Sequence, residues 1–102
     1  MPAQDDWVVF LESNPVYWKI SQSKIMVNIL KEFANEALTL EALYFKNPKM
    51  PLPELEEILN TFVSVRLVVK RMIAGTIVFA LTAEGKKFLE LYKKAEKSFT
   101  IK

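Results

Sequence analysis

The stretch from Leu67 to Tyr92 constrains the fold of this chain more than any other. It is first rich in β-branched residues with the period of two that favours strands, and then changes to the 3.6-residue period of a helix. Gly75 can supply the positive φ of a tight turn, and Thr82 can cap a first helical turn with its hydroxyl oxygen. The segment therefore predicts strands over about 67–73 and 76–81, an Ala74-Gly75 turn, and a helix from Ala83 to about Ser98.

Four helices are predicted before this hairpin, each from apolar residues at helical spacing and a capping residue. A large apolar set on the second and fourth helices is expected to form the core. Its members are Ile29, Leu30, Phe33, Leu55, Ile58, Leu59 and Phe62. The expected helices are Trp7 to about Ser13 (cap Asp5 or Asp6), Lys24 to about Ala37 (cap Ser21 or Ser23), Thr39–Lys46, and Leu52–Ser64 after an Asn47–Pro51 turn.

The composition excludes most kinds of catalysis. The 102 residues include no histidine and no cysteine, which removes imidazole acid–base chemistry, nucleophilic triads and the usual zinc sites. Two glycines leave no phosphate-binding loop. The carboxylate pairs Asp5/Asp6 and Glu56/Glu57 are interpreted as structural, because neighbours on a helix do not face each other. We therefore expect no enzyme, no cofactor and no metal.

Length and charge suggest a single intracellular domain. With 51% apolar residues the chain can bury one core, and no apolar run reaches the roughly 20 residues that cross a bilayer. The N-terminus begins with Gln4, Asp5 and Asp6, which does not predict a secretory signal. We expect one domain over residues 1–102 in the cytoplasm, with an N-terminal extension (5–20), a core (21–81) and a C-terminal helix (82–102).

The order of helices, hairpin and final helix resembles small winged helix-turn-helix proteins of the MarR and PadR kind. It is especially similar to small archaeal winged-helix regulators with a C-terminal dimerisation helix. Leu52–Ser64 takes the place of the recognition helix, and Leu81-Thr82-Ala83-Glu84-Gly85 that of the "LT-x-x-G" signature. The resemblance implies an α+β, mostly α fold and a DNA-binding regulator or chromatin-associated factor.

The chain departs from that family at the hairpin. A glycine usually precedes the first wing strand, whereas Arg66 stands here, so this bend must form differently. The wing is short and unusually apolar, with Met72, Ile73, Ile77 and Val78. Two explanations stay open: the hairpin packs against another subunit, or the first helix covers it with Trp7, Tyr17 and Trp18.

Charge is divided unevenly along the chain. Residues 1–60 carry nine acidic and five basic residues, whereas residues 61–102 carry three acidic and nine basic ones. Such asymmetry indicates a surface for a polyanion, although for Lys86–Lys97 taken alone a solvated lysine-rich helix is the favoured interpretation. The candidate contacts to double-stranded DNA are Lys46, Lys49, Asn60, Thr61, Ser64, Arg66, Lys70 and Arg71.

The residues at the start of Leu52–Ser64, the helix in the place of the recognition helix, argue against DNA as the ligand. Glu54 and Glu57 stand on its outer face, where duplex DNA repels carboxylates unless a cytosine amino group binds one. The alternative function is therefore a winged-helix adaptor that binds a protein, through Glu54, Glu56 and Glu57 or through the apolar hairpin, without DNA.

The last helix predicts a homodimer. An apolar stripe recurs along it at three- and four-residue steps and reaches almost to the C-terminus. We expect a second copy to cover this stripe across a two-fold axis, with packing on its own domain as the alternative. The expected interface consists of Phe88, Leu91, Tyr92, Ala95 and Phe99.

Overall fold

Short polar side chains cap several helices, and Ser23 and Thr39 do so at positions that the sequence predicted. Ser23 accepts from the Met26 N–H at 3.2 Å, and Thr39 accepts from the Ala42 N–H at 3.1 Å. Asn14 accepts from the Val16 N–H at 2.9 Å and begins a helix that the sequence did not predict. Each bond satisfies an N–H group that has no partner inside its own helix.

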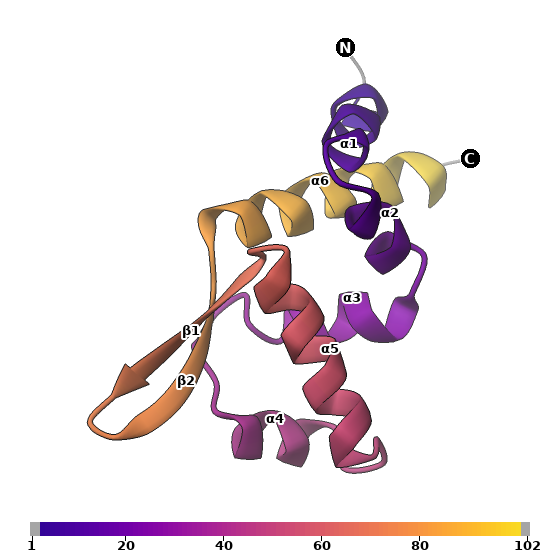
Figure 1. Cartoon of the computed structure of the whole chain (residues 1–102). Coiled ribbons are helices and arrows are strands. Elements are labelled where there is room, and N and C mark those ends of the chain that lie inside the picture. Colours follow the sequence, from indigo (N-terminus) through magenta and orange to yellow (C-terminus); the bar gives the residue numbers. More distant parts are fainter. Residues whose placement is uncertain (1–2, 101–102) are drawn as a thin grey trace.

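The computed structural model describes the backbone of residues 3–100 and the side-chain surroundings of residues 6–96. Six helices and one hairpin form a mostly helical winged-helix fold in these residues (Figure 1). The elements are α1 (Ala3–Glu12), α2 (Pro15–Ser21), α3 (Lys24–Lys31), α4 (Leu40–Lys46), α5 (Leu52–Ser64), β1 (Val68–Ile73), β2 (Thr76–Leu81) and α6 (Ala83–Thr100).

The hairpin projects away from the helices beside α5 (Figure 1). Its antiparallel register runs from the pair Val68 and Leu81 at the base to the pair Ile73 and Thr76 at the tip. Ala74 and Gly75 form the predicted two-residue turn, with φ values of 50° and 82°. At the base of the hairpin, backbone bonds of 2.8 and 2.9 Å pair Leu38 with Phe79 and cover part of the β2 edge.

No glycine precedes β1, and Arg66 itself adopts the left-handed conformation at this position, with φ 64°. Helix α5 ends there because the Leu67 N–H donates to the Phe62 carbonyl (3.0 Å) and the Arg66 N–H donates to the Val63 carbonyl (3.1 Å). These two bonds are the usual closing pattern of a helix that ends at a left-handed residue.

Thr82 joins the end of α5, the base of the hairpin and the start of α6. Its hydroxyl lies within hydrogen-bond distance of the Arg66 and Leu67 carbonyls and accepts from the Gly85 N–H at 2.9 Å. Its own N–H donates to the Leu67 carbonyl at 3.0 Å. The predicted cap is thus confirmed, and it also connects three elements.

The predicted core is confirmed. Every residue of the set expected from α3 and α5 is buried, including Leu59 and Phe62. Leu43 from α4, Leu67 and Val68 from the hairpin base, and Phe88 from α6 complete the same cluster. The core therefore lies between the helices, and only the base of the hairpin takes part in it.

An aromatic cluster attaches α1 and α2 to α6. The rings of Trp7 and Phe10 pack edge-on against Phe88, with centroid separations of 5.2 and 6.0 Å, and Tyr17 stacks on Phe10 at 4.8 Å. The Tyr17 hydroxyl donates to the Glu84 carboxylate at 3.0 Å. Burial, followed by this bond and the charge of Glu84, raises the pKa of Tyr17 to about 12, so the phenol keeps its proton as donor.

This cluster corrects the expectation for the stripe on α6. Phe88, Leu91 and Ala95 are buried within the chain and Tyr92 is half-buried, so packing on the same domain supplies the cover that we expected from a second copy. Residue Phe99 lies outside the side chains that the structure describes. The contribution of these residues to a dimer is reconsidered below.

The same contacts exclude one explanation of the apolar hairpin. Trp7 and Tyr17 pack on α6, and Trp18 is 57% exposed, so the first helix does not cover the hairpin. The tip of the hairpin stays exposed, so of the two explanations left open, cover by the first helix is the wrong one.

Four other local expectations differ from the structure. Helix α1 begins at Ala3, so Asp6 lies inside it instead of capping it, and Asp5 is outside the side chains described. Residues 16–18 are helical, because Asn14 caps and Pro15 suits a first turn. Helix α3 ends at Lys31, short of the predicted Ala37. Ile25, Tyr44 and Leu52, which their helical spacing places with the apolar faces, are exposed.

The close approach at Gly85 provides a test of the junction. A Cβ on this residue would lie 2.1 Å from the Leu67 carbonyl oxygen, a backbone atom that is already held by Thr82. We expect Gly85→Ala to lower the free energy of unfolding by about 1–3 kcal/mol through overpacking. Chemical denaturation measures it, with Lys86→Ala on the exposed side of α6 as the control. Equal stability of the two variants would contradict the close approach.

Candidate nucleic-acid interface

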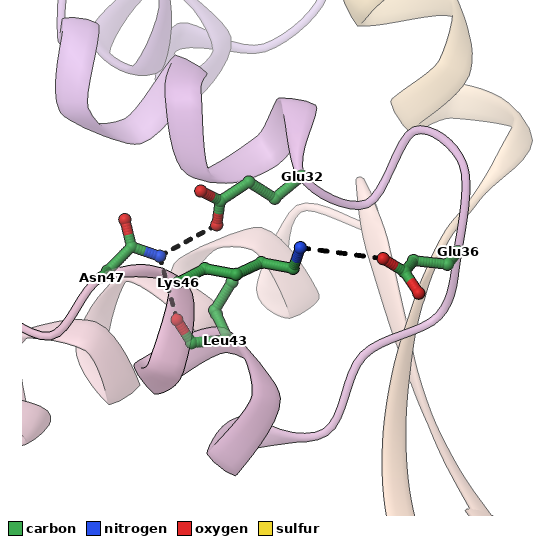
Figure 2. Close-up of polar contacts among 5 residues, drawn as sticks. All are labelled: Glu32, Glu36, Leu43, Lys46 and Asn47. Atoms are coloured by element: carbon green, nitrogen blue, oxygen red, sulfur yellow. Dashed lines mark hydrogen bonds and ion pairs between the residues drawn. The ribbon is translucent and has the colours of Figure 1, made fainter.

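Helices α4 and α5 form a helix-turn-helix whose turn is held by Asn47. The Asn47 amide donates to the Glu32 carboxylate at 2.8 Å and to the Leu43 carbonyl at 3.0 Å (Figure 2). One bond ends α4 and the other ties the turn to the end of α3. Contacts among the turn, α4 and the end of α3 therefore fix the direction in which α5 begins.

Lys46 lies on α4 and points toward the loop after α3. Its Nζ is 3.7 Å from the Glu36 carboxylate (Figure 2). Both side chains are substantially exposed, so the pair adds little stability, and it can open when a phosphate competes. Lys49 is exposed in the α4–α5 turn at the same end of the domain.

The outer face of α5 is acidic at its start and neutral at its end. Glu54, Glu57 and Asn60 are exposed there. The Thr61 hydroxyl donates to the Glu57 carbonyl at 3.0 Å, and the Ser64 hydroxyl donates to the Thr61 carbonyl at 2.8 Å. In this arrangement the two hydroxyls offer an acceptor oxygen to a ligand, whereas Asn60 can both donate and accept.

The structure divides six of the eight predicted contact residues into three pairs, and Thr61 and Arg71 line neither of the hollows involved. Lys46 and Lys49 lie near the start of α5, and Ser64 and Arg66 lie at its end. Ser64 and Arg66 line a hollow of about 410 Å³, together with Asn14, Tyr17, Val65 and Glu84. Only Asn60 and Lys70 come together across the space between α5 and the hairpin. Thirteen residues of α5 separate the two end groups by about 20 Å, at 1.5 Å per residue.

The space between the hairpin and helices α4 and α5 is a hollow of about 640 Å³. Leu40, Leu59 and Phe79 provide its apolar lining, and Lys70 is a cation beside it. Glu41 and Glu56 also face this hollow. Sequence reasoning missed Glu41, because an exposed glutamate on a short helix carries no signal of what stands opposite.

Lys70 and Arg71 follow each other on β1 and therefore point to opposite faces of the hairpin. Lys70 shares the face of Phe79, which turns toward the body, and Arg71 shares the face of Val78. Both side chains are exposed. From Val65 to Ala83 the chain contains three cations and no carboxylate, so the hairpin itself is cationic, although Glu41 and Glu56 line the hollow beside Lys70.

Comparisons with known proteins support the fold. No model of a protein family and no curated protein matches this sequence. Solved structures do match. TubR of Bacillus thuringiensis, bound to 24 bp of tubC, has a TM-score of 0.68 at 15% identity over 79% of this chain and 91% of its own.

Two further structures give the same result. A Staphylococcus aureus MepR mutant bound to an oligodeoxyribonucleotide has a TM-score of 0.69 at 16% identity, over 95% of this chain and 70% of its own. The adhesin competence repressor AdcR of Streptococcus pyogenes has a TM-score of 0.63 at 14% identity, over 94% and 72%. Identities this low establish the winged-helix fold and leave function to the site itself.

The turn between α4 and α5 provides a test of the site's framework. Asn47→Ala removes two hydrogen bonds, one of them to a carboxylate, and leaves the Leu43 carbonyl without that donor. We expect a loss of about 1–2 kcal/mol in the free energy of unfolding. Thermal or urea unfolding measures it, with Asn35→Ala in the exposed loop after α3 as the control. No difference between the two variants would show that the turn is held by other contacts.

Proposed function

We propose that this chain is a DNA-binding winged-helix transcription regulator that acts as a dimer on double-stranded DNA in the cytoplasm. The observation that carries the proposal is the hairpin beside α5, which holds Arg66, Lys70 and Arg71 without any carboxylate. A polyanion gains from such a surface through release of its counterions. The fold shared with two proteins solved on DNA supports the same conclusion.

In this proposal the exposed cations hold the backbone of DNA and α5 approaches its bases. Lys70 and Arg71 bind phosphates from the hairpin, and Lys49 does so from the turn. Asn60 is the residue of α5 suited to reading an adenine, because its amide can both donate and accept. Thr61 and Ser64 contribute acceptor oxygens, and Lys46 joins once its pair with Glu36 opens.

We propose a different dimer interface from the one that the sequence suggested. Val8, Val9 and Trp18 are 50%, 67% and 57% exposed, although each is large and apolar. Val8 and Trp18 also line a hollow of about 440 Å³, together with Leu11, Glu12 and Pro15. A second copy docking on α1 and α2 would cover this surface, while α6 supports it from within.

One observation favours the second candidate function, a protein-binding adaptor. Glu54, Glu56 and Glu57 are all exposed on α5, within the element that a DNA regulator inserts into the major groove. A basic protein surface would fit this face better than DNA does. The two functions make opposite predictions for neutralising these carboxylates.

DNA binding is tested by titrating random-sequence duplex DNA at two salt concentrations. We expect binding that weakens steeply with salt, and the pair Lys70→Ala with Arg71→Ala should reduce the slope of log affinity against log salt by about two units. Gel shift or fluorescence anisotropy measures it, and Lys24→Ala, an exposed lysine on α3, is the control. A chain without salt-dependent binding would leave the adaptor as the better function.

Glutamine substitutions separate the two functions further. If the carboxylates of α5 only repel phosphate, Glu54→Gln with Glu57→Gln strengthens DNA binding. If they bind a basic partner protein, neither the parent chain nor this variant binds DNA, and the variant has a lower affinity for that protein. Asn60→Ala is expected to change sequence preference more than overall affinity.

The dimer is tested by light scattering at micromolar concentration. We expect the parent chain to scatter as a dimer and Val9→Asp with Trp18→Asp to scatter as a folded monomer with weaker DNA binding. Ile25→Asp, on exposed apolar surface of α3, is the control and should leave the dimer intact. A parent chain that remains monomeric as its concentration rises would overturn this interface.

A further inference from the structure

The tip of the hairpin is apolar and uncovered. Met72, Ile73 and Ile77 are 69%, 56% and 42% exposed around the Ala74-Gly75 turn. Each Å² of apolar surface left in water costs about 25 cal/mol relative to burial. A two-residue turn needs no apolar neighbours, so the chemistry of these side chains points to something that they contact.

The register gives the tip its shape. Met72 stands directly opposite Ile77, on the hairpin face that also carries Lys70 and Phe79. Ile73 stands opposite Thr76 on the other face, which also carries Arg71. Both faces of the tip are therefore apolar, so the tip forms a thin apolar wedge and not a single flat patch.

Cations flank this wedge on both sides. Lys70 comes two residues before Met72 on one face, and Arg71 comes two residues before Ile73 on the other. At about 3.4 Å per residue, the Cα of each cationic residue lies about 7 Å behind that of the apolar residue on the same face. Because no carboxylate interrupts the hairpin, the charges favour a polyanion that borders a narrow apolar space on both sides.

The minor groove of duplex DNA is the part of a polyanion that fits this wedge. Two phosphate strands border a groove about 6 Å wide. Its floor consists of base edges, and the apolar base faces become accessible where a base step is partly unstacked. Strands of a hairpin are about 4.8 Å apart before their side chains are added, so the tip enters only if the groove widens. Apolar side chains make that opening favourable when they replace part of the contact between two stacked base pairs.

We propose that the hairpin tip acts as an apolar wedge: Met72 and Ile73 enter the minor groove, partly unstack one base step and bend the DNA. Lys70 and Arg71 hold the phosphates of the two bordering strands. This inference rests on the DNA binding proposed above and adds how the DNA is deformed. Steps such as TA or CA are the preferred targets, because they unstack most easily.

The experiment uses the full chain and short duplexes with a dye at each end and 2-aminopurine beside a central TA step. Energy transfer between the dyes reports bending, and 2-aminopurine fluorescence reports unstacking. We expect both to rise when the parent protein saturates the duplex, and to rise less on a duplex whose centre is an A-tract.

The decisive variant is Met72→Ala with Ile73→Ala. Both side chains are exposed, so the fold is retained, which circular dichroism checks. We expect salt-dependent binding to persist while most of the bending and unstacking signal is lost. Ile25→Ala, of similar exposure on α3, is the control and should bend DNA as the parent does.

Each outcome decides the proposal. Bending and unstacking by the alanine variant equal to that of the parent would overturn the wedge. Binding by the parent without either signal would also overturn it, would leave DNA binding standing, and would assign the exposed tip to a protein surface. A parent chain with no salt-dependent binding to these duplexes would overturn DNA binding and the wedge together.

Discussion

The hydrogen bonds of Thr82 are the interaction on which the positions of the other elements depend. One hydroxyl caps α6 and lies against the carbonyls of Arg66 and Leu67, so the end of α5, the base of the hairpin and the start of α6 meet at one point. Gly85 allows α6 to approach that point, because any larger residue would collide with the Leu67 carbonyl. The hairpin can then project from the body while only its base is buried.

This junction places two surfaces of opposite character side by side. The hairpin is cationic with an apolar tip, and α5 begins with three exposed glutamates. Between them lies a hollow that contains both Glu56 and Lys70. In the proposed complex with DNA, the ligand would be bound mainly through the hairpin, with α5 contributing from Asn60 onward. In most helix-turn-helix proteins the first turn of the recognition helix contributes more.

The aromatic cluster decides which surface is left for another copy of the chain. Phe88 is enclosed by Trp7, Phe10 and Tyr17, so the stripe on α6 forms part of the core. The outer sides of α1 and α2 then carry exposed apolar residues beside that core, including Val9 and Trp18. Within the described part of the chain no helix is long and apolar enough to span a bilayer.

The sequence by itself determined the local structure of this protein, and the tertiary structure decided which surfaces are free. Thr82, Thr39 and the Ala74-Gly75 turn act within a few residues, so their positions were sufficient to predict the hairpin and the starts of α4 and α6. The helical spacing of the apolar residues of α5 was sufficient to predict its buried face. Pairing between distant residues has no such signal: Phe88 meets Trp7, and Glu41 faces Lys70, only after the chain has folded. An apolar stripe has the same spacing whether its own domain or a second copy covers it, and only the packing of α1 on α6 distinguishes the two.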